Sequence, residues 1–549
     1  MPPTSRRLRT VLLAAASAGL IAAAPPAPLG NGPLGIGDRL FPTLGNPGYD
    51  VLSYDIALDY DGSNTDPLEA VTDIRARTTE PLDRINLDFA RGEVHSVAVN
   101  GLAARFTGED EDLVVTPVAP LPAGVPVRIT VRHTSDPDQG TDSGGWVRTG
   151  DGLALAGQAD AAHRVFPCND HPADKAYFTF RITTPEQLTA VANGLPAGER
   201  HRGTTVTRTF RTEHPMATEL AQVSLGTSAI LHRDGPGGLP LRDVVPAADA
   251  AVLEPWLSRT PGQMEWMERQ VGPYPFETYG VLVADSVTGF ELETQTLSLF
   301  ERRLFTGTTH PGWYVDSVMV HELAHQWFGD SVSPASWSDL WLNEGHASWY
   351  EARYAAERGG PALERRMRDA YTHSDGWRAA GGPPARPALP TAGHKLDLFR
   401  PVVYDGSALV LYALRQEIGA EAFDRLERAW VRRHRDESAT TADFVRLASR
   451  EAGRDLSGFL DGWLYGAKTP AMPGHPDWHG AAPTATAPEP APTTTAPEPA
   501  SHTAPPAGRP ARSVAPRGNP HDGPGGRMPV SGSATRPGPV NSLGNHPGV

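Results

Sequence analysis

The alternation of apolar and polar residues changes character along the 549-residue chain. From about residue 48 to residue 227 the apolar positions recur every second residue, which is the period of a half-buried β-strand. Two such runs hold Tyr54, Ile56, Leu58 and Tyr60, and then Ile85, Leu87 and Phe89. The dipeptide Asn100-Gly101 is a strong signal of a hairpin turn. This pattern predicts an all-β N-terminal domain over residues 48–227.

From about residue 228 to residue 478 the pattern changes to a few strands followed by long amphipathic helices. A stretch rich in glycine and proline, GGPPARPALPTAGH from Gly381, predicts a loop within this second domain. After Trp478 the composition turns to Pro, Ala, Thr and Gly, and TAPEPA occurs at Thr486 and again at Thr495. Such a sequence cannot bury enough apolar surface to offset its chain entropy. Residues 479–549 are therefore predicted to be a disordered low-complexity tail.

The segment VMVHELAHQWFGD, from Val318, combines an apolar helical stripe with two histidines and a glutamate. The stripe consists of Val320, Leu323, Ala324 and Trp327. On another face His321 and His325 lie one helical turn apart, with Glu322 beside them, so the helix is predicted to be buried on both sides. Buried imidazoles and a buried carboxylate need polar partners, and one metal ion would satisfy them together.

A third metal ligand is available in WSDLWLNEGHASWYEARYAAERGG, where Glu344 follows after an interval that lets the chain return on a second, antiparallel helix. Two imidazoles, one carboxylate and an open fourth position form the ligand set of catalytic zinc, whereas structural zinc sites are usually closed by cysteine-rich sets. The chain has one cysteine. We therefore expect one catalytic zinc per chain. The alternative is a chance His-Glu-x-x-His on a solvated helix face.

Charge and composition narrow the function classes. The formal net charge of −15 disfavours a nucleic-acid-binding surface, which needs clustered Lys and Arg. Residues 1–30 contain an arginine-rich start and the short apolar run TVLLAAASAGLIAAA, which predicts a signal peptide and a secreted or cell-envelope-associated protein. An uncleaved N-terminal anchor is the alternative. No other segment is apolar for long enough to span a membrane.

The single cysteine, Cys168, cannot form a disulfide within the chain. We interpret it as a packed small hydrophobe. A nucleophilic role would require a histidine partner, for which His163 and His171 are the neighbours in sequence.

Several segments carry a family resemblance. VHELAHQWFGD together with LWLNEGHASWYE resembles the zinc signature of the aminopeptidase N family, the gluzincin zinc aminopeptidases that include leukotriene-hydrolysing enzymes. RVFPCNDHPADKAYFTFRITTP, from Arg164, and VGPYPFETYGVLV, from Val271, are similar to further family segments in the family's order. The resemblance runs from about Tyr49 to about Trp478. It implies a multidomain protein in which the all-β domain precedes a thermolysin-like α/β zinc catalytic domain. It is similar to a short, actinobacterial-like secreted member in which the tail replaces the C-terminal helical domain.

The resemblance also assigns roles to individual residues. His321, His325 and Glu344 match the zinc ligands, and Glu322 matches the general base that takes a proton from water. In PVVYDGSALVLYALRQEIG, Tyr404 is similar to the tyrosine that donates to the tetrahedral intermediate, although Gly406-Ser407 replaces the family's Lys-Gly. The alternative for Tyr404 is a core tyrosine at the start of a helix.

Exopeptidase action requires a negative group that holds the substrate's α-ammonium. TGFELETQTLSLF resembles the family's G-x-M-E-N strand with Glu293 at the glutamate, while Glu291 on the same strand face is the competing carboxylate. Gln158 is similar to the glutamine that the family's β domain directs at the substrate amine. His346, two residues after Glu344, is interpreted as a packed residue and not as a fourth ligand.

These expectations together predict a secreted zinc-dependent aminopeptidase that acts on peptides with a free N-terminus. A zinc endopeptidase or an epoxide hydrolase on the same site is the alternative within enzymes. The alternative from another class is a catalytically lapsed envelope-binding protein that keeps only the fold.

Overall fold

The computed structural model describes residues 35–137, 144–391 and 395–480. Both the predicted signal peptide and nearly all of the predicted tail lie outside these residues. Within them, no helix is long and apolar enough to cross a membrane.

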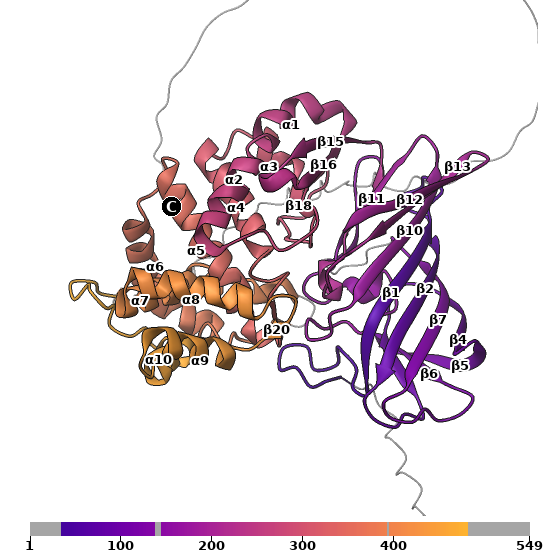
Figure 1. Ribbon diagram of the computed structural model, residues 1–549, viewed down its shortest axis with the longest axis horizontal. Helices are drawn as coiled ribbons and strands as arrows, with labels where there is room; N and C mark the ends of the chain where they lie inside the picture. Colours follow the sequence, from indigo (N-terminus) through magenta and orange to yellow (C-terminus); the bar gives the residue numbers. More distant parts are fainter. Residues whose placement is uncertain (1–34, 138–143, 392–394, 481–549) are drawn as a thin grey trace, which may run out of the picture. The chain divides into compact units, whose positions relative to one another are not determined.

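The first part of the described chain is built from strands. Its largest sheet, counted over the described residues, has ten strands in the order β12-β13-β10-β1-β2-β7-β4-β5-β6-β3. Figure 1 shows β10, β1, β2 and β7 side by side in this sheet. Their bounds are β1 Tyr49–Asp59, β2 Leu68–Thr78, β3 Ile85–Asp88, β4 Val94–Val99, β5 Leu102–Glu109, β6 Asp112–Thr116, β7 Pro126–Ser135, β10 Tyr177–Pro185, β12 Leu195–Arg202 and β13 Thr205–Arg211. A second sheet has the order β11-β14-β9-β8, with β8 Gly145–Arg148, β9 Leu153–Ala156, β11 Thr189–Ala192 and β14 Val223–Gly226.

The alternation in the sequence corresponds to the two faces of the large sheet. The apolar set of β1 is buried, and the residues between them are exposed or only partly buried. Asn100 and Gly101 both have positive φ values, of 51° and 80°, and join β4 to β5 as a two-residue hairpin. A turn of this type requires left-handed backbone at both central positions, which Asn and Gly adopt most readily. The predicted all-β domain is therefore confirmed.

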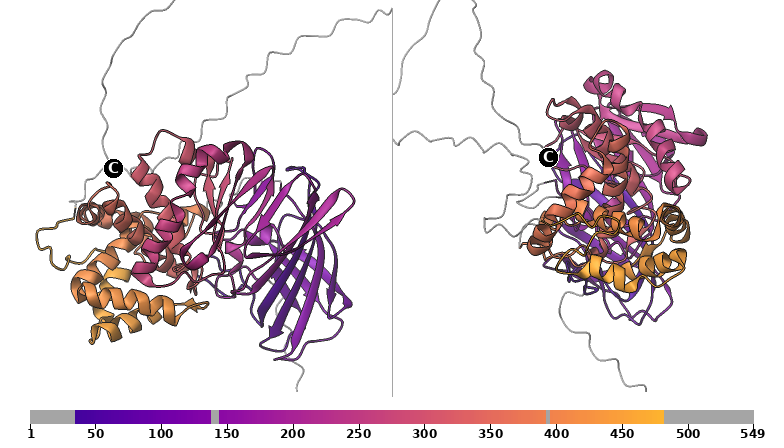
Figure 2. Two further views of the ribbon diagram at one scale, coloured as in Figure 1. Left: turned by 45° about the horizontal axis from the view of Figure 1, so that its top comes forward. Right: turned by 90° about the vertical axis from the view of Figure 1, so that its left-hand side faces the viewer.

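The second part combines a mixed sheet with helices, which agrees with the predicted α/β class. The sheet order is β15-β16-β17-β18, with β15 Ser228–Asp234, β16 Pro240–Pro246, β17 Val281–Ala284 and β18 Ser298–Glu301. The helices pack together in Figure 2. Their bounds are α1 Ala250–Leu257, α2 Thr260–Val271, α3 Arg302–Thr306, α4 Gly312–His325, α5 Trp341–Glu357, α6 Leu363–Gly381, α7 Asp405–Ile418, α8 Ala420–Arg433, α9 Thr441–Ala452 and α10 Ser457–Tyr465. Two short strands, β19 Ser333–Pro334 and β20 Ser438–Ala439, pair in parallel beside them.

The helix that carries the two histidines is shorter than its apolar stripe suggests. α4 is buried from Met319 to His325, as expected for a helix covered on both sides, but it ends at His325. Trp327 lies in the following turn, where its N–H donates to the carbonyl of Ala324. Gly329, with φ 139°, lies within this turn, and the N–H of Asp330 donates back to the carbonyl of His325. The helical stripe is therefore correct up to Ala324, and the assignment of Trp327 to it is wrong.

The predicted strand around Glu293 is also wrong. β18 begins at Ser298, and the segment before it makes only an isolated bridge between Leu292 and Leu299. The backbone carbonyl of Glu293 accepts from the Gln326 side chain at 3.0 Å instead of from a neighbouring strand. Thr294 Oγ1 closes a local turn by donating to the Leu297 carbonyl at 2.5 Å. Side-chain hydrogen bonds have replaced the sheet ladder here.

Candidate functional site

Helices α4 and α5 bring the predicted metal ligands together. Glu344, in the first turn of α5, lies with its Oε2 3.3 Å from His321 Nε2 and 3.4 Å from His325 Nε2. Glu351, two turns further along α5, contacts His321, which comes one turn earlier on α4. The later residue on α5, Glu351, thus contacts the earlier histidine on α4, while Glu344 alone reaches the later one, His325. The two helices are therefore antiparallel, as predicted. All three ligand residues are buried.

Each histidine is oriented by a hydrogen bond on its other ring nitrogen. His321 Nδ1 lies 3.1 Å from Glu351 Oε2, and His325 Nδ1 lies 3.1 Å from the Phe328 carbonyl oxygen. Such partners fix the tautomer and direct the opposite nitrogen toward a metal. Here both Nε2 atoms point at Glu344. Two imidazole nitrogens and one carboxylate oxygen, all within 4.8 Å of one another, fit the donor set of a catalytic zinc ion.

Glu293, Glu322 and His325 form a second group with ligand atoms inside the same limit. We assign the metal to His321, His325 and Glu344. In the second group Glu293 approaches His325 on its Nδ1 side, at 3.9 Å, where the ring already faces the Phe328 carbonyl. The second group also contains only one imidazole. Its carboxylates are therefore better suited to act on a substrate beside the metal.

The charges of the ligands follow from their contacts. Burial by itself would raise the pKa of Glu344, but His325 and His321 outweigh that effect and lower the pKa to about 2. Burial would lower the pKa of His321, whereas the carboxylates of Glu344 and Glu351 raise it to about 10. Glu344 is thus an anionic ligand. A metal must displace the proton that these carboxylates stabilise on His321, so metal binding at this site releases protons.

Glu322 lies next to the ligands without belonging to them. Its side chain is buried, and its Oε2 has no hydrogen-bond partner in the described part of the chain. Burial raises its pKa well above the ordinary glutamate value, and neighbouring carboxylates, first that of Glu293, add to the rise while His325 opposes it. A carboxylate with a free oxygen and a raised pKa beside a metal site can accept and return a proton.

Tyr404 directly precedes helix α7 and lies beside His321. The centroid of its ring is 6.0 Å from that of His321. Burial, followed by the charges of Glu344 and Glu293, raises its pKa well above 10. The phenol therefore stays protonated and can donate a hydrogen bond. This geometry agrees with the predicted role of Tyr404 as a hydrogen-bond donor to the tetrahedral intermediate. Its position at the start of a helix agrees equally with the alternative, a core tyrosine.

Glu293 and Gln158 meet although 135 residues separate them in sequence. Gln158 Nε2 donates to Glu293 Oε1 at 2.6 Å. Glu293 is 3% exposed, and among the described residues its one ion pair within 4.0 Å is the 3.9 Å contact with His325. Glu291, the competing carboxylate, is less buried than Glu293, and burial followed by the charge of Glu301 raises its pKa to about 7. The structure therefore brings Glu293 to Gln158 beside the metal ligands.

The sequence patterns did not reveal the charged side chains that support His321, which are Glu351 and Arg366. Arg366 on α6 donates to Glu351 Oε1 at 2.9 Å and lies 2.9 Å from Asp405, the residue after Tyr404. Burial would raise the pKa of Glu351, but Arg366 and His321 lower it to about 2. A chain of charges thus links the outer partner of one ligand to the start of α7. Glu351 follows Glu344 by two helical turns, and that spacing is the signal that could have revealed it.

Two other candidate residues are structural, as predicted. His346 stacks on Phe328 with ring centroids 4.4 Å apart, and its Nδ1 donates to the Leu342 carbonyl, so it points away from the metal ligands. Cys168 is buried, and burial raises its pKa well above the ordinary thiol value. Of its neighbours in sequence, His163 pairs with Asp170 at 2.7 Å and His171 with Asp38 at 3.2 Å.

Comparison with known proteins adds independent findings. Residues 51–220 match the family model of the peptidase M1 N-terminal domain, and residues 257–463 match that of the peptidase family M1 domain. Aminopeptidase N of Streptomyces lividans is 25% identical over 438 residues, which cover 75% of this chain and 50% of that protein. Leucine aminopeptidase 2 of Sclerotinia sclerotiorum is 30% identical over 353 residues, covering 58% and 54% respectively. This chain therefore spans about half the length of these curated relatives.

Solved structures match over nearly their whole length. An M1 zinc metallopeptidase from Deinococcus radiodurans has 28% sequence identity and a TM-score of 0.69, covering 80% of this chain and 98% of that one. A mutant of it bound to a Tyr-Ser-Ala substrate gives the same identity and TM-score. A two-domain M1 zinc metallopeptidase mutant bound to L-arginine has 28% identity and a TM-score of 0.70, covering 80% of this chain and 99% of that one.

Proposed function

The chain belongs to peptidase family M1, and on that premise we propose that it is a zinc-dependent aminopeptidase that removes N-terminal residues from peptides. The names of its relatives, aminopeptidase N and leucine aminopeptidase 2, support this proposal. So does the solved relative that binds a tripeptide substrate.

One observation carries the exopeptidase assignment. Glu293 is a deeply buried carboxylate beside the zinc ligands, and its hydrogen-bond partner there is the neutral amide of Gln158. A buried negative charge held by neutral donors is well placed to bind a cationic substrate group. The α-ammonium of a peptide fits this requirement. Its distance from the first peptide bond is fixed, so binding it at Glu293 brings that bond to the zinc ligands and no other.

The remaining residues would carry the hydrolysis. His321, His325 and Glu344 would hold the zinc ion, which when bound would supply Lewis-acid polarisation of the scissile carbonyl and activation of water. Glu322 would take a proton from the water molecule while the oxygen of that water adds to the carbonyl carbon. It then gives that proton to the departing nitrogen as the C–N bond breaks. The unpaired Oε2 and the raised pKa of Glu322 support both transfers.

Tyr404 would stabilise the negative oxygen that forms after the addition. Its raised pKa keeps the hydroxyl protonated at neutral pH, so it donates and does not compete as an anion. A donor already aimed at the developing charge lowers the barrier without reorganisation during the reaction.

The test is the effect of Glu293→Ala on free and blocked peptides. For a free-amine peptide, kcat/KM is expected to fall about 30-fold to several thousand-fold. This corresponds to a loss of ~2–5 kcal/mol of transition-state stabilisation, as when one partner of a buried charge pair is removed. An N-acetylated peptide should be a poor substrate for the wild-type protein and should change little in the variant. Glu291→Ala is the matched control, because it removes the neighbouring carboxylate and should preserve the preference for a free amine.

The alternatives give different outcomes in the same assay. Equal cleavage of acetylated and free peptides by the wild-type protein would indicate an endopeptidase. A loss caused by Glu291→Ala and not by Glu293→Ala would overturn the anchor assignment. Purified protein that binds no zinc would support the lapsed envelope-binding alternative.

We further propose that the protein is exported, on the basis of residues 1–30 alone. The chain recovered from the culture medium or the cell envelope should begin near residue 31. Recovery from the cytoplasm of a chain that still begins at Met1 would contradict export.

A further inference from the structure

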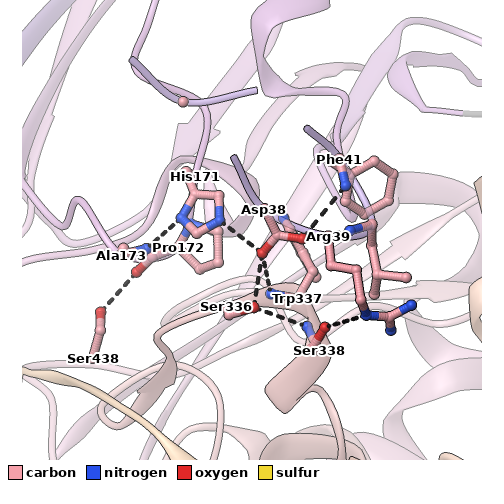
Figure 3. A network of polar contacts seen from close by, with 12 residues as sticks. Asp38, Arg39, Phe41, His171, Pro172, Ala173, Ser336, Trp337, Ser338 and Ser438 are labelled. Carbon is pink, nitrogen blue, oxygen red and sulfur yellow. Dashed lines mark hydrogen bonds and ion pairs between the residues drawn. The ribbon is translucent and has the colours of Figure 1, made fainter. Parts of the chain in front are cut away.

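A segment without helix or strand, residues 35–48, precedes β1 and contacts the part of the molecule that carries the zinc ligands. We call it the strap. The sequence pattern assigned residues 35–47 to neither the signal peptide nor the β domain. The polar contacts around its residue Asp38 are drawn in Figure 3.

Asp38 is the centre of these contacts. Its buried carboxylate accepts from Leu40 N at 2.8 Å within the strap, from Ser336 Oγ at 2.8 Å and from Trp337 N at 2.9 Å, and it pairs with His171 Nε2 at 3.2 Å. Burial would raise its pKa, but these partners hold the pKa well below the usual range. Asp38 therefore stays charged and joins three segments that are distant in sequence (Figure 3).

Arg39 extends the same attachment. Its Nε donates to Ser338 Oγ at 3.2 Å, and its Nη2 donates to the Pro387 carbonyl at 2.6 Å. Two successive strap residues thus hold the short segment Ser336–Ser338, which leads into helix α5. Because the contacts with Ser336–Ser338 and Pro387 each span about 300 residues of sequence or more, forming them depends on the complete fold.

The apolar residues of the strap fill a cluster that is distinct from the two large cores. The strap contributes Leu40, Phe41 and Leu44, and the other buried members are Ala159, Trp337, Leu340, Leu398, Val402 and Val403. Phe41 packs edge-on against Trp337 with ring centroids 5.7 Å apart. One third of this buried cluster therefore comes from the strap.

The other members of the cluster are neighbours of residues in the site. Ala159 follows Gln158, and Val403 precedes Tyr404. The Leu340 carbonyl accepts from the backbone N–H of Glu344 at 3.1 Å in the first turn of α5. Three segments that carry site residues thus meet at one apolar contact. Protein interiors are close-packed, so removing one side chain from this cluster loosens the packing of all its neighbours.

We propose that the strap is a positioning element of the active site, which holds the segments of Gln158 and Tyr404 in register with α5. The expected loss of peptidase activity rests on the proposed function, whereas the expected loosening of the two segments does not. The zinc ligands His321 and His325 lie on α4, and Glu344 lies on α5 between Leu342 and Ala347. Both helices contribute to the large core of the second part. Zinc binding is therefore expected to survive when the strap is loosened, while amine binding and transition-state contact are lost.

The experiment compares Phe41→Ala with Phe210→Ala in the full chain. Both phenylalanines are 5% exposed, but Phe210 belongs to the core of the β domain. Hydrogen exchange is measured on the backbone amides of residues 157–161 and 398–406, together with zinc content and cleavage of free and N-acetylated peptides. Phe41→Ala is expected to speed exchange in both segments by at least tenfold, to keep one zinc per chain, and to lower kcat/KM for free-amine peptides by at least tenfold. Phe210→Ala should change none of these values below its unfolding temperature.

A milder variant keeps the test valid if Phe41→Ala does not fold. Asp38→Asn preserves the side-chain shape but removes the charge at the centre of Figure 3, and it should move the same measurements in the same direction. Unchanged exchange in both segments would overturn the inference, whether or not the protein proves to be a peptidase. Faster exchange in a protein with no peptidase activity would instead retain the strap and reject the proposed function.

Discussion

Replacing Glu322 by Gln is expected to lower kcat by at least ~10²-fold while one zinc per chain remains bound. Glutamine has the same shape, but its amide cannot take a proton from water at neutral pH. The zinc ligands are His321, His325 and Glu344, so the substitution leaves the donor set complete. Because Glu322 Oε2 has no partner among the described residues, the new amide also breaks no hydrogen bond at that atom.

The measurement is kcat on a free-amine peptide together with zinc content by elemental analysis. Glu291→Gln is the matched control, since Glu291 is another acidic group near the site with a raised pKa and is assigned no proton transfer. It should stay within a few-fold of the wild-type rate. Near-normal turnover in Glu322→Gln would reject Glu322 as the base.

Substitution of His325 by Ala should abolish zinc binding and activity together. His325 Nε2 lies 3.4 Å from Glu344 Oε2, and its removal leaves a single imidazole and one carboxylate, which is less than the three protein ligands of a catalytic zinc site. It also leaves Glu344 buried with half of its histidine partners. Zinc content is expected to fall from one per chain to near zero, with turnover falling in proportion.

His346→Ala is the control for this second prediction. His346 is equally buried, lies two residues after Glu344 on α5, and contacts Phe328 instead of the ligands. That variant should keep its zinc even if stability decreases. Full zinc occupancy in His325→Ala would show that the ligand assignment is wrong. If His346→Ala lost zinc at the same time, His346 would be the ligand instead.

The sequence alone was sufficient wherever the structure depends on short-range geometry. Alternation with a period of two predicted β1, and Asn100-Gly101 predicted a hairpin, because each depends on the backbone of adjacent residues. The four-residue spacing of His321 and His325 predicted a shared ligand site for the same reason. The interval to Glu344 predicted a second, antiparallel helix, but it did not predict β19 or the 3-10 helix Trp337–Asp339 that lie between the two helices.

The tertiary structure decided everything that depends on contacts between distant segments. The contact of Gln158 with Glu293 spans 135 residues. The family resemblance directed both residues at the substrate amine, but no pattern in the sequence predicted the hydrogen bond between them. Glu293 was expected on a strand, but a side-chain bond from Gln326 and a local turn hold its backbone instead. Neither bond has a periodic signal in the sequence, because each joins one particular side chain to one particular carbonyl.

The strap is the clearest example of this limit. Its residues follow no helical or strand period, so sequence patterns assign them no structure. Their role comes from Asp38 reaching Trp337 across 299 residues and from an apolar cluster shared with the neighbours of Gln158 and Tyr404. Periodicity reports which face of a regular element is buried. Which irregular segment covers a site is decided only when distant parts of the chain pack together, since only then do burial and hydrogen bonding offset the entropy of ordering it.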